Sequence, residues 1–171
     1  MASPRLASTA EALSIKQVKS VSTEIDMPTL AVTKGLLALW EESQGLDGEL
    51  PFYRDFAPEK LGKLAPYVYA LERTDFGDDF HICYMGEAIA QSVGHDYTGE
   101  MTFEYSQHPS AWRVEIYRKV LARGEPVFTA VSLGDFERDN VKTECVLLPV
   151  FDEAGALNIV VCAAAPYTEN N

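Results

Sequence analysis

Apolar and polar residues alternate with a period of two in the middle of the chain. They do so over residues 66–72 and again over 80–85, and TDFGDDF between the two runs is rich in turn residues. Such alternation is typical of half-buried strands, so the two runs predict a β-hairpin. Three further strand-like runs follow at 126–133, 141–150 and 157–164, where GDFERDN and FDEAG serve as hairpin turns.

Helical spacing of apolar residues marks the segments around these strands. One helix is predicted from Thr33, which can cap it, to Gly45, which stops it. Shorter helices are predicted at 55–64 and 87–93. The most convincing helix spans 109–124, opening with a proline and ending at a glycine.

The first 30 or so residues are less apolar and rich in serine, threonine and alanine. We expect a helix between Ala10 and Ile25, ended by Pro28. Its apolar stripe is narrow, and a helix of this kind is marginal alone in water. It therefore needs a surface to lie on, from its own domain or from a second copy of the chain.

The elements together predict an α+β fold. Because an isolated hairpin is unstable, the two early and three late strands are expected to share one five-stranded antiparallel sheet, with helices on one face. We divide the chain into an N-terminal helical extension (1–32), the main domain (33–165) and a short tail (166–171).

Charge narrows the classes of partner. Lysine and arginine number 14 against 26 aspartates and glutamates, a net charge of −12. Nucleic-acid binding needs a basic stripe, and no run of basic residues is present. Anionic membrane surfaces are disfavoured for the same reason.

The hydropathy of the chain and its cysteines both indicate a protein of the cytoplasm. No window is apolar enough to span a bilayer, and the N-terminus lacks the apolar core of a secretory signal. We predict a cytoplasmic protein. Cys83, Cys145 and Cys162 lie far apart in apolar strand-like runs, so buried reduced thiols are expected, with redox sensing as the alternative.

Catalytic and metal-binding motifs are missing. There is no GxSxG elbow, P-loop, HExxH or CxxC. His81, His95 and His108 share no metal-ligand spacing, so ordinary polar positions are expected, with a haem axial ligand as the alternative. We therefore predict no catalytic residues, no metal and no cofactor, and a protein that is not an enzyme.

Four segments stand out, which are FHICYMGEAI at 80–89, GHDYTG at 94–99, YRKVLARGEP at 117–126 and TECVLLPV at 143–150. They resemble a PAS-like family of small bacterial proteins that often consist of little besides this domain. The resemblance covers roughly residues 36–165. It implies the PAS topology and a sensory or interaction module, which binds small molecules or pairs with other domains, often beside histidine kinases.

Two cysteines depart from the pattern of that family. Cys83 and Cys145 stand where its members tend to carry basic residues. If those basic groups bind a partner or ligand in the family, that particular function is in doubt for this chain.

A ligand pocket is one expectation from this fold. We place Phe80, Ile82 and Tyr84 on the helix-covered face, because Tyr84 leads directly into Gly86 and the next helix. Two interpretations stay open: a filled core without ligand, and a cavity for a small apolar or aromatic molecule. The opposite wall is expected to consist of Phe103, Trp112 and Ile116.

The other face of the sheet is then expected to carry His81, Cys83 and Met85. Such a face is too apolar to be left exposed. We predict that it is an interface, covered by the N-terminal segment, by a second subunit or by both. The N-terminal residues expected to contribute are Val18, Val21 and Ile25.

Glycines and two carboxylates are expected to shape the loops. Gly86, Gly94 and Gly99 would turn the chain sharply off the sheet edge and across its face. Asp96 could hold its loop by accepting backbone N–H bonds. Glu144 is a charge within an apolar strand, and two interpretations stay open: an outward-facing surface carboxylate, or a buried one with a partner.

From these observations we expect a non-catalytic, cytoplasmic PAS-like sensory or interaction module in bacterial signalling. It would act through protein–protein contacts, with a small ligand left open. A homodimer is expected, with a sensor histidine kinase or another regulator as partner. The alternative is a small-molecule-binding or catalytic α+β protein with a pocket around Tyr84 and Trp112.

Overall fold

The computed structural model describes residues 20–74, 79–101, 113–133 and 141–168. Among these residues no helix is long and apolar enough to cross a membrane. The elements, in chain order, are β1 (Ser20–Glu24), α2 (Ala31–Ser43), the 3-10 helices η1 (Leu46–Gly48) and η2 (Tyr53–Phe56), α3 (Pro58–Leu61), the 3-10 helix η3 (Gly62–Tyr67), β2 (Val68–Arg73), β3 (Phe80–Met85), α4 (Glu87–Val93), α5 (Arg113–Arg123), β4 (Val127–Leu133), β5 (Val141–Phe151) and β6 (Leu157–Thr168).

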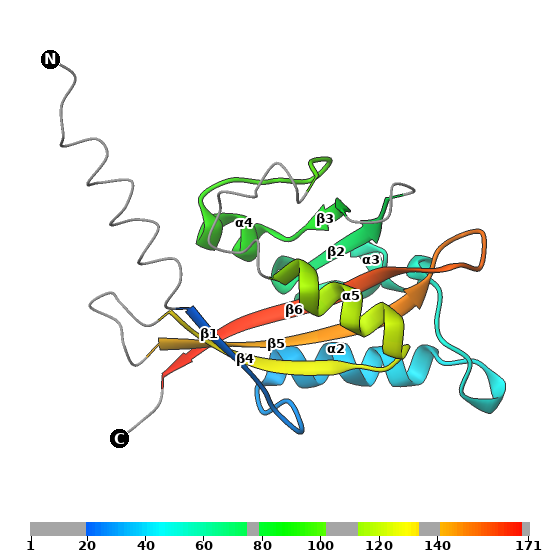
Figure 1. Cartoon of the computed structure of the whole chain (residues 1–171), viewed down its shortest axis with the longest axis horizontal. Helices are drawn as coiled ribbons and strands as arrows, with labels where there is room; N and C mark the ends of the chain where they lie inside the picture. The colour runs from blue at the N-terminus through cyan, green and yellow to red at the C-terminus, as the bar shows by residue number, and fades with distance from the viewer. Residues whose placement is uncertain (1–19, 75–78, 102–112, 134–140, 169–171) are drawn as a thin grey trace, which may run out of the picture.

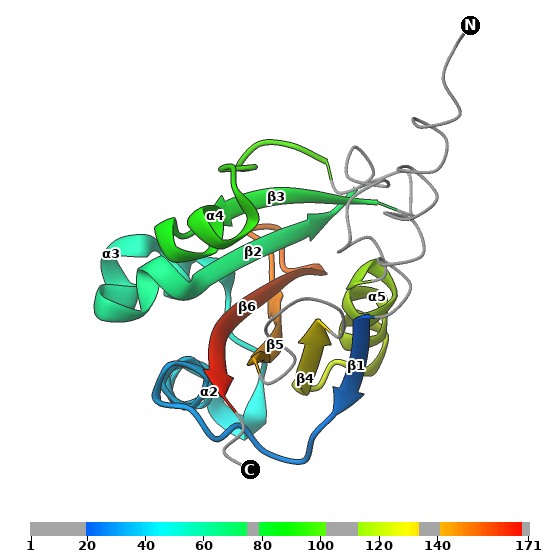
Figure 2. The same cartoon turned by 90° about the vertical axis from the view of Figure 1, so that its left-hand side faces the viewer.

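All the strands form one antiparallel sheet in the order β1-β4-β5-β6-β2-β3 (Figures 1 and 2). The predicted hairpin is β2–β3, and it joins the three later strands through β6. The α+β fold class is therefore confirmed. The final strand runs on to Thr168, three residues past the predicted end of the domain at 165.

The sixth strand is the first difference from the prediction. Residues 20–24 form β1, which pairs with β4 in the register Ser20↔Leu133 to Glu24↔Thr129. A helix across these residues was the wrong expectation, because β4 would otherwise be an edge strand with unpaired backbone groups, and β1 covers it. Residues 1–19, with the rest of the predicted helix and Val18, lie outside the described part of the chain.

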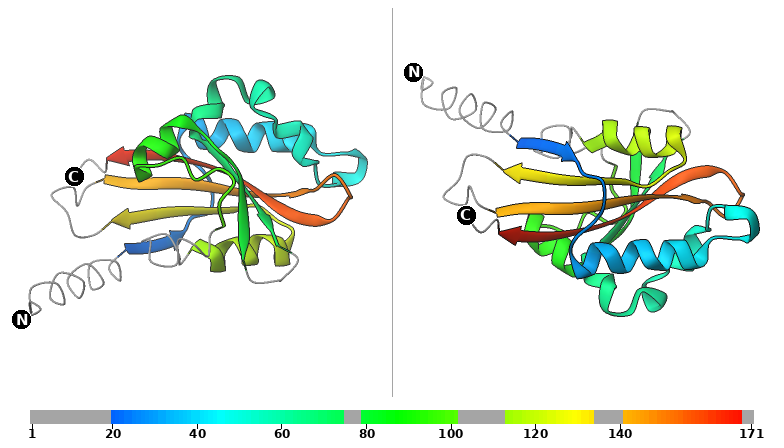
Figure 3. Two further views of the ribbon diagram at one scale, coloured as in Figure 1. Left: turned by 90° about the horizontal axis from the view of Figure 1, so that it is seen from above. Right: turned by 90° about the horizontal axis from the view of Figure 1, so that it is seen from below.

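Helices cover both faces of the sheet, which is the second difference. Helix α5 packs on one cluster of buried residues and α2 packs on another (Figure 1). Figure 3 shows α2 beside β5 and β6 in the view from below. Strand β5 serves both clusters, since Cys145 and Leu147 belong to the first and Val146 and Leu148 to the second. An unbroken apolar run such as CVLLPV is typical of a strand buried on both faces.

A buried carboxylate holds the start of α2. Glu144 of β5 is only 2% exposed. One of its carboxylate oxygens accepts hydrogen bonds from the amides of Thr29 (2.7 Å) and Leu30 (3.0 Å) and from the hydroxyl of Thr33. The other accepts the Thr29 hydroxyl at 2.5 Å. Burial alone would raise the pKa of Glu144, but these hydrogen bonds outweigh it and lower the pKa.

This contact changes two expectations. Of the two interpretations of Glu144, the buried one applies, with hydroxyl and amide donors as its partners. Helix α2 begins at Ala31 with Leu30 as its N-cap, so Thr33 is not the cap. Anions stabilise helix N-termini, and here the anion comes from a distant strand.

Candidate functional site

A β-bulge in β3 decides which side chains reach which face of the sheet. Ala70 pairs with Tyr84 and Leu71 pairs with Ile82, so Cys83 is an extra residue in the pairing. A bulge reverses the alternation of side chains beyond it. Met85 accordingly packs on the α5-side cluster, whereas Tyr84 packs on the α2-side cluster.

The pocket predicted around Tyr84 and Trp112 is therefore not assembled as expected. Tyr84 lies on the α2 face, and its hydroxyl donates a hydrogen bond to the carbonyl oxygen of Ala65 at 2.9 Å. Burial, and then the charge of Asp96, raises the pKa of Tyr84. Trp112 and Phe103 lie outside the described residues.

The other predicted pocket residues belong to the core beneath α5. Phe80 is fully buried, and its ring meets that of Tyr117 edge-on with 5.6 Å between centroids. Ile82 is buried in the same cluster, and Ile116 packs against it from α5. Phe80 and Ile82 therefore lie on the face where we expected them, within well-packed surroundings.

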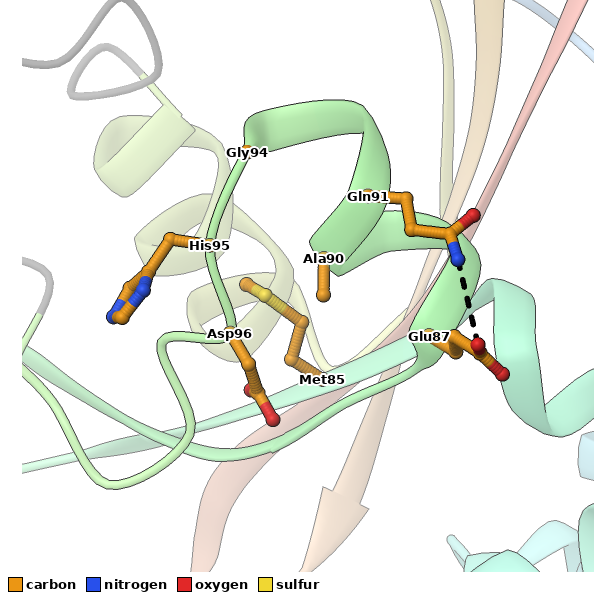
Figure 4. A pocket seen from close by; sticks show the side chains of 7 residues that line it. All are labelled: Met85, Glu87, Ala90, Gln91, Gly94, His95 and Asp96. Atoms are coloured by element: carbon orange, nitrogen blue, oxygen red, sulfur yellow. Dashed lines mark hydrogen bonds between the residues drawn. The ribbon is translucent and has the colours of Figure 1, made fainter.

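The structure instead has a pocket beside α4, with a volume of about 530 Å³. It lies between the helix, the end of β3 and the loop that follows the helix (Figure 4). Three of its residues were predicted for other roles, since Met85 was assigned to an interface and Gly94 and Asp96 to a structural loop. The lining residues are Met85, Glu87, Ala90, Gln91, Gly94, His95 and Asp96.

Two glycines place α4 against the end of the strand. A methyl group on Gly86 would lie 2.2 Å from the carbonyl oxygen of Ala65 and 2.4 Å from that of Pro66, which only glycine avoids. The chain can therefore leave β3 close to η3 and start a helix at once. Gly94 ends that helix in the left-handed conformation, with φ of 88°.

The loop after α4 is pinned to β3 and forms the far wall of the pocket. The carboxylate of Asp96 accepts bonds from the hydroxyl (2.7 Å) and the amide (3.0 Å) of Thr98, which lower the pKa of Asp96. The Gly99 amide donates to the carbonyl of Ile82 at 2.8 Å. The Ile82 amide in turn donates to the carbonyl of Glu100 at 2.9 Å.

The lining of the pocket combines apolar atoms with two acidic groups. Met85 and Ala90 supply the apolar atoms, and Glu87 and Asp96 supply two carboxylates (Figure 4). The amide of Gln91 donates to Glu87 at 3.3 Å, so that carboxylate is already partly engaged. Such a lining suits a small molecule with an apolar body and a hydrogen-bond-donating or cationic group.

A second cluster of polar groups lies on the α2 face of the β2–β3 hairpin. Ligand atoms of Glu72, His81 and Cys83 all lie within 4.8 Å of one another. Burial, and then the charge of Glu72, raises the pKa of the Cys83 thiol to about 11. Burial also raises the pKa of nearby Tyr53 to about 12, assisted by the same thiol and carboxylate.

Sequence reasoning missed this cluster, because it compared the spacing of histidines only. The available signal was a His-x-Cys step on one strand of a predicted hairpin, with a glutamate on the strand opposite.

The residues predicted for an interface lie in different places. His81 and Cys83 share the face that we expected, and Met85 does not. Of the predicted N-terminal interface residues, Val21 pairs with Ser132 within β1–β4, and half-buried Ile25 donates its amide to Phe128 at 2.9 Å.

No family model and no curated protein matches the chain. Among solved structures, an RNA-binding light-oxygen-voltage receptor is 17% identical with a TM-score of 0.46, and the match covers 88% of this chain and 39% of that one. A sensory box sensor histidine kinase from Vibrio cholerae is 17% identical with a TM-score of 0.48, covering 68% of this chain and 93% of that one. A variant of Vivid is 13% identical with a TM-score of 0.45, covering 85% and 99%.

The order of elements in this chain matches the order that its sequence predicts. A hairpin is followed by helices and then by three more antiparallel strands, as the resemblance implied. Likeness of this extent to solved structures says nothing about ligand or partner, because one fold can serve many functions.

Proposed function

We propose that this chain is a non-catalytic, cytoplasmic PAS-like sensory module that takes up a small molecule in the pocket beside α4. The observation that carries the proposal is the position of Met85. Its side chain lines the pocket and also packs against the cluster of buried residues beneath α5. An occupant of the pocket would therefore press directly on the core of the sheet.

The surroundings of the pocket support a route for the signal. Ile89 of α4 and Tyr97 of the loop pack on the same cluster as Met85. The cluster continues through α5 to β4, the strand that β1 covers. A change at the pocket would thus reach the opposite edge of the sheet, at β4 and β1. We propose that the protein contacts a second copy or a signalling partner, such as a sensor histidine kinase, at that edge.

The composition of the pocket supports binding without catalysis. Among the described residues that line it there is no serine, cysteine, threonine, tyrosine or lysine that could act as a nucleophile. The only imidazole in the lining belongs to His95, which lies 3.3 Å from the carboxylate of Glu100 and edge-on to Tyr97. General acid–base chemistry needs a group aimed at the reacting atoms. The imidazole is engaged at the rim, and the two carboxylates of the lining already accept hydrogen bonds, Glu87 from Gln91 and Asp96 from Thr98.

Native mass spectrometry of the purified protein, compared with its denatured mass, tests the proposal. We expect mass above a whole number of chains in the native state. An Ala90→Trp substitution fills the pocket and should abolish the excess mass. The matched control is Ala122→Trp, which adds the same side chain at an exposed position of α5 and should retain it.

Thermal unfolding of both variants establishes that they are folded. Whole-number masses for the unsubstituted protein would contradict ligand uptake. Excess mass that persists in the folded Ala90→Trp variant would place the ligand elsewhere in the molecule. The number of chains in the native complex reports on the homodimer in the same experiment.

A further inference from the structure

The cluster on the α2 face of the β2–β3 hairpin combines three different metal-ligating side chains. The Cys83 sulfur lies 3.9 Å from Nδ1 of His81. A carboxylate oxygen of Glu72 lies within 4.8 Å of the ligand atoms of His81 and Cys83. Cys83 is a free thiol, so its sulfur is available as a ligand.

The fold holds these side chains together through strand pairing. Glu72 and His81 are directly opposite each other in the β2–β3 register. His81 and Cys83 are two positions apart on β3, and the bulge reverses the alternation only beyond Cys83. Their side chains therefore share one face of the sheet. Strand β3 ends the sheet, as Figure 2 shows, and its outer edge is hydrogen-bonded at Ile82 to the loop that follows α4, so the cluster is built on a strand that is held from both sides.

Burial of the cluster is intermediate, which suits an ion that must enter from water. All three side chains are half-buried. Tyr53 of η2 lies near Cys83 and Glu72, and it packs, like Cys83, against the α2-side core. The site is thus bounded by packed side chains on one side and open on the other.

We propose that Glu72, His81 and Cys83 bind one Zn²⁺ ion. Thiolate, imidazole and carboxylate are the three ligand types that zinc takes in proteins, at about 2.0–2.3 Å from the metal. In a tetrahedron such bonds put ligand atoms about 3.3–3.8 Å apart, so the present side chains need to approach by about 1 Å. A thiolate and a carboxylate together balance the charge of a divalent ion, and water would take the fourth position.

The ligand types also exclude the hard cations. Calcium and magnesium bind almost entirely through oxygen, whereas two of these three ligands are sulfur and nitrogen. The site does not use the pocket beside α4, because that pocket lies on the opposite face of the sheet at Met85. Zinc binding is therefore independent of the proposed ligand uptake.

Isothermal titration of the chelator-treated full chain with Zn²⁺ tests the proposal. We expect one ion per chain. Co²⁺ in place of zinc should give a thiolate-to-metal charge-transfer band, which reports directly on the Cys83 sulfur. Cys83→Ser and His81→Asn should each weaken zinc binding by about 100-fold or more, since even outer-shell partners of a metal are worth 10–100-fold.

Matched controls separate this site from other ligand groups. Cys162→Ala removes a fully buried thiol of the opposite cluster, and His95→Asn removes an exposed imidazole that also lies beside a glutamate. Both should bind zinc as the unsubstituted chain does. Glu72→Gln keeps the side-chain shape and should lower the affinity while the protein stays folded.

Three results would overturn the proposal. They are no saturable binding at one ion per chain, unchanged affinity in both Cys83→Ser and His81→Asn, or a cobalt band that survives Cys83→Ser. The Ala90→Trp variant should bind zinc normally, so that failure of the metal site and failure of the pocket can be told apart.

Discussion

The two faces of the sheet are built in different ways. On one face, α2 buries Leu36, Leu37 and Trp40, and the Trp40 indole donates to the carbonyl of Pro149 at 2.9 Å. On the other face, α4 has no buried residue and stands beside a pocket. The first face is closed by α2, which is itself part of the core. On the second face α5 packs into the core in the same way, and α4 beside it covers the core incompletely.

The range of the hydrogen bonds shows the same contrast. Glu144 joins residues 111 to 115 positions apart in the chain. Around α4 and its loop, the side-chain hydrogen bonds of Gln91, Ser92, His95 and Asp96 span only two to five residues. Regions with few buried apolar contacts open more easily than the core. We infer that α2 and its contact with Glu144 add to the stability of the domain, whereas α4 and its loop carry its response.

The largest expected effect is therefore on the α2 face. Replacing Glu144 by alanine removes the shared acceptor of four donors at the start of α2, including the buried Thr33 hydroxyl, and should lower the free energy of unfolding by about 3 kcal/mol. Urea-induced unfolding measures the change. The control is Glu153→Ala at an exposed ion pair, expected to change stability by less than about 0.5 kcal/mol. Equal losses in both variants would mean that Glu144 does not anchor α2.

A smaller loss is expected at the start of α4. A methyl group at Gly86 collides with backbone carbonyl oxygens of η3, which cannot rotate away, so Gly86→Ala should cost about 2 kcal/mol. In Gly35→Ala the methyl group would meet a Leu64 side-chain carbon at 3.1 Å, which can move, and higher helix propensity offsets the contact. Little net change is expected there. A Gly86→Ala protein as stable as the original would contradict the close approach at η3.

The pH dependence of stability provides a further test of Glu144. Its pKa is lowered in the folded state, so its contribution is present above the ordinary value of 4.5 and is lost as the pH falls through the folded value. The free energy of unfolding should therefore decrease with acidification below about pH 4.5. Glu144→Gln should flatten this decrease. A parallel pH profile in the variant would assign the acid sensitivity to other carboxylates.

The smallest effect is expected where β1 meets α5 at the surface. Glu24 of β1 contacts Lys119 at 2.7 Å and Arg123 at 3.2 Å. The hydrogen bond and charge of Lys119, together with those of Arg123, outweigh desolvation and lower the pKa of Glu24. Because exposed ion pairs are screened by salt, Glu24→Gln should lower the melting temperature slightly at low ionic strength and leave it unchanged at high ionic strength. A loss that persists at high salt would mean that Glu24 acts through packing.

Much of the fold could be predicted because its signals are local. Period-two alternation located β2 and β3, and helical spacing located α2, α4 and α5. Gly94 and Gly124 end their helices, as their positions indicated. The candidate site was harder, since only its loop residues were anticipated at their actual location. Met85, which links the pocket to the core, was assigned to the wrong face.

The amino-acid sequence by itself determined which segments become strands and helices, because periodicity and chain-breaking residues act over a few positions. Only the tertiary structure decided the rest. The bulge at Cys83 reversed the faces of Tyr84 and Met85, since strand register depends on the partner strand. Glu144 of β5 accepts hydrogen bonds from the start of α2, and residues 20–24 form a strand because they pair with β4. Both contacts join backbone groups that are far apart in the chain and need hydrogen-bond partners once folding brings them together.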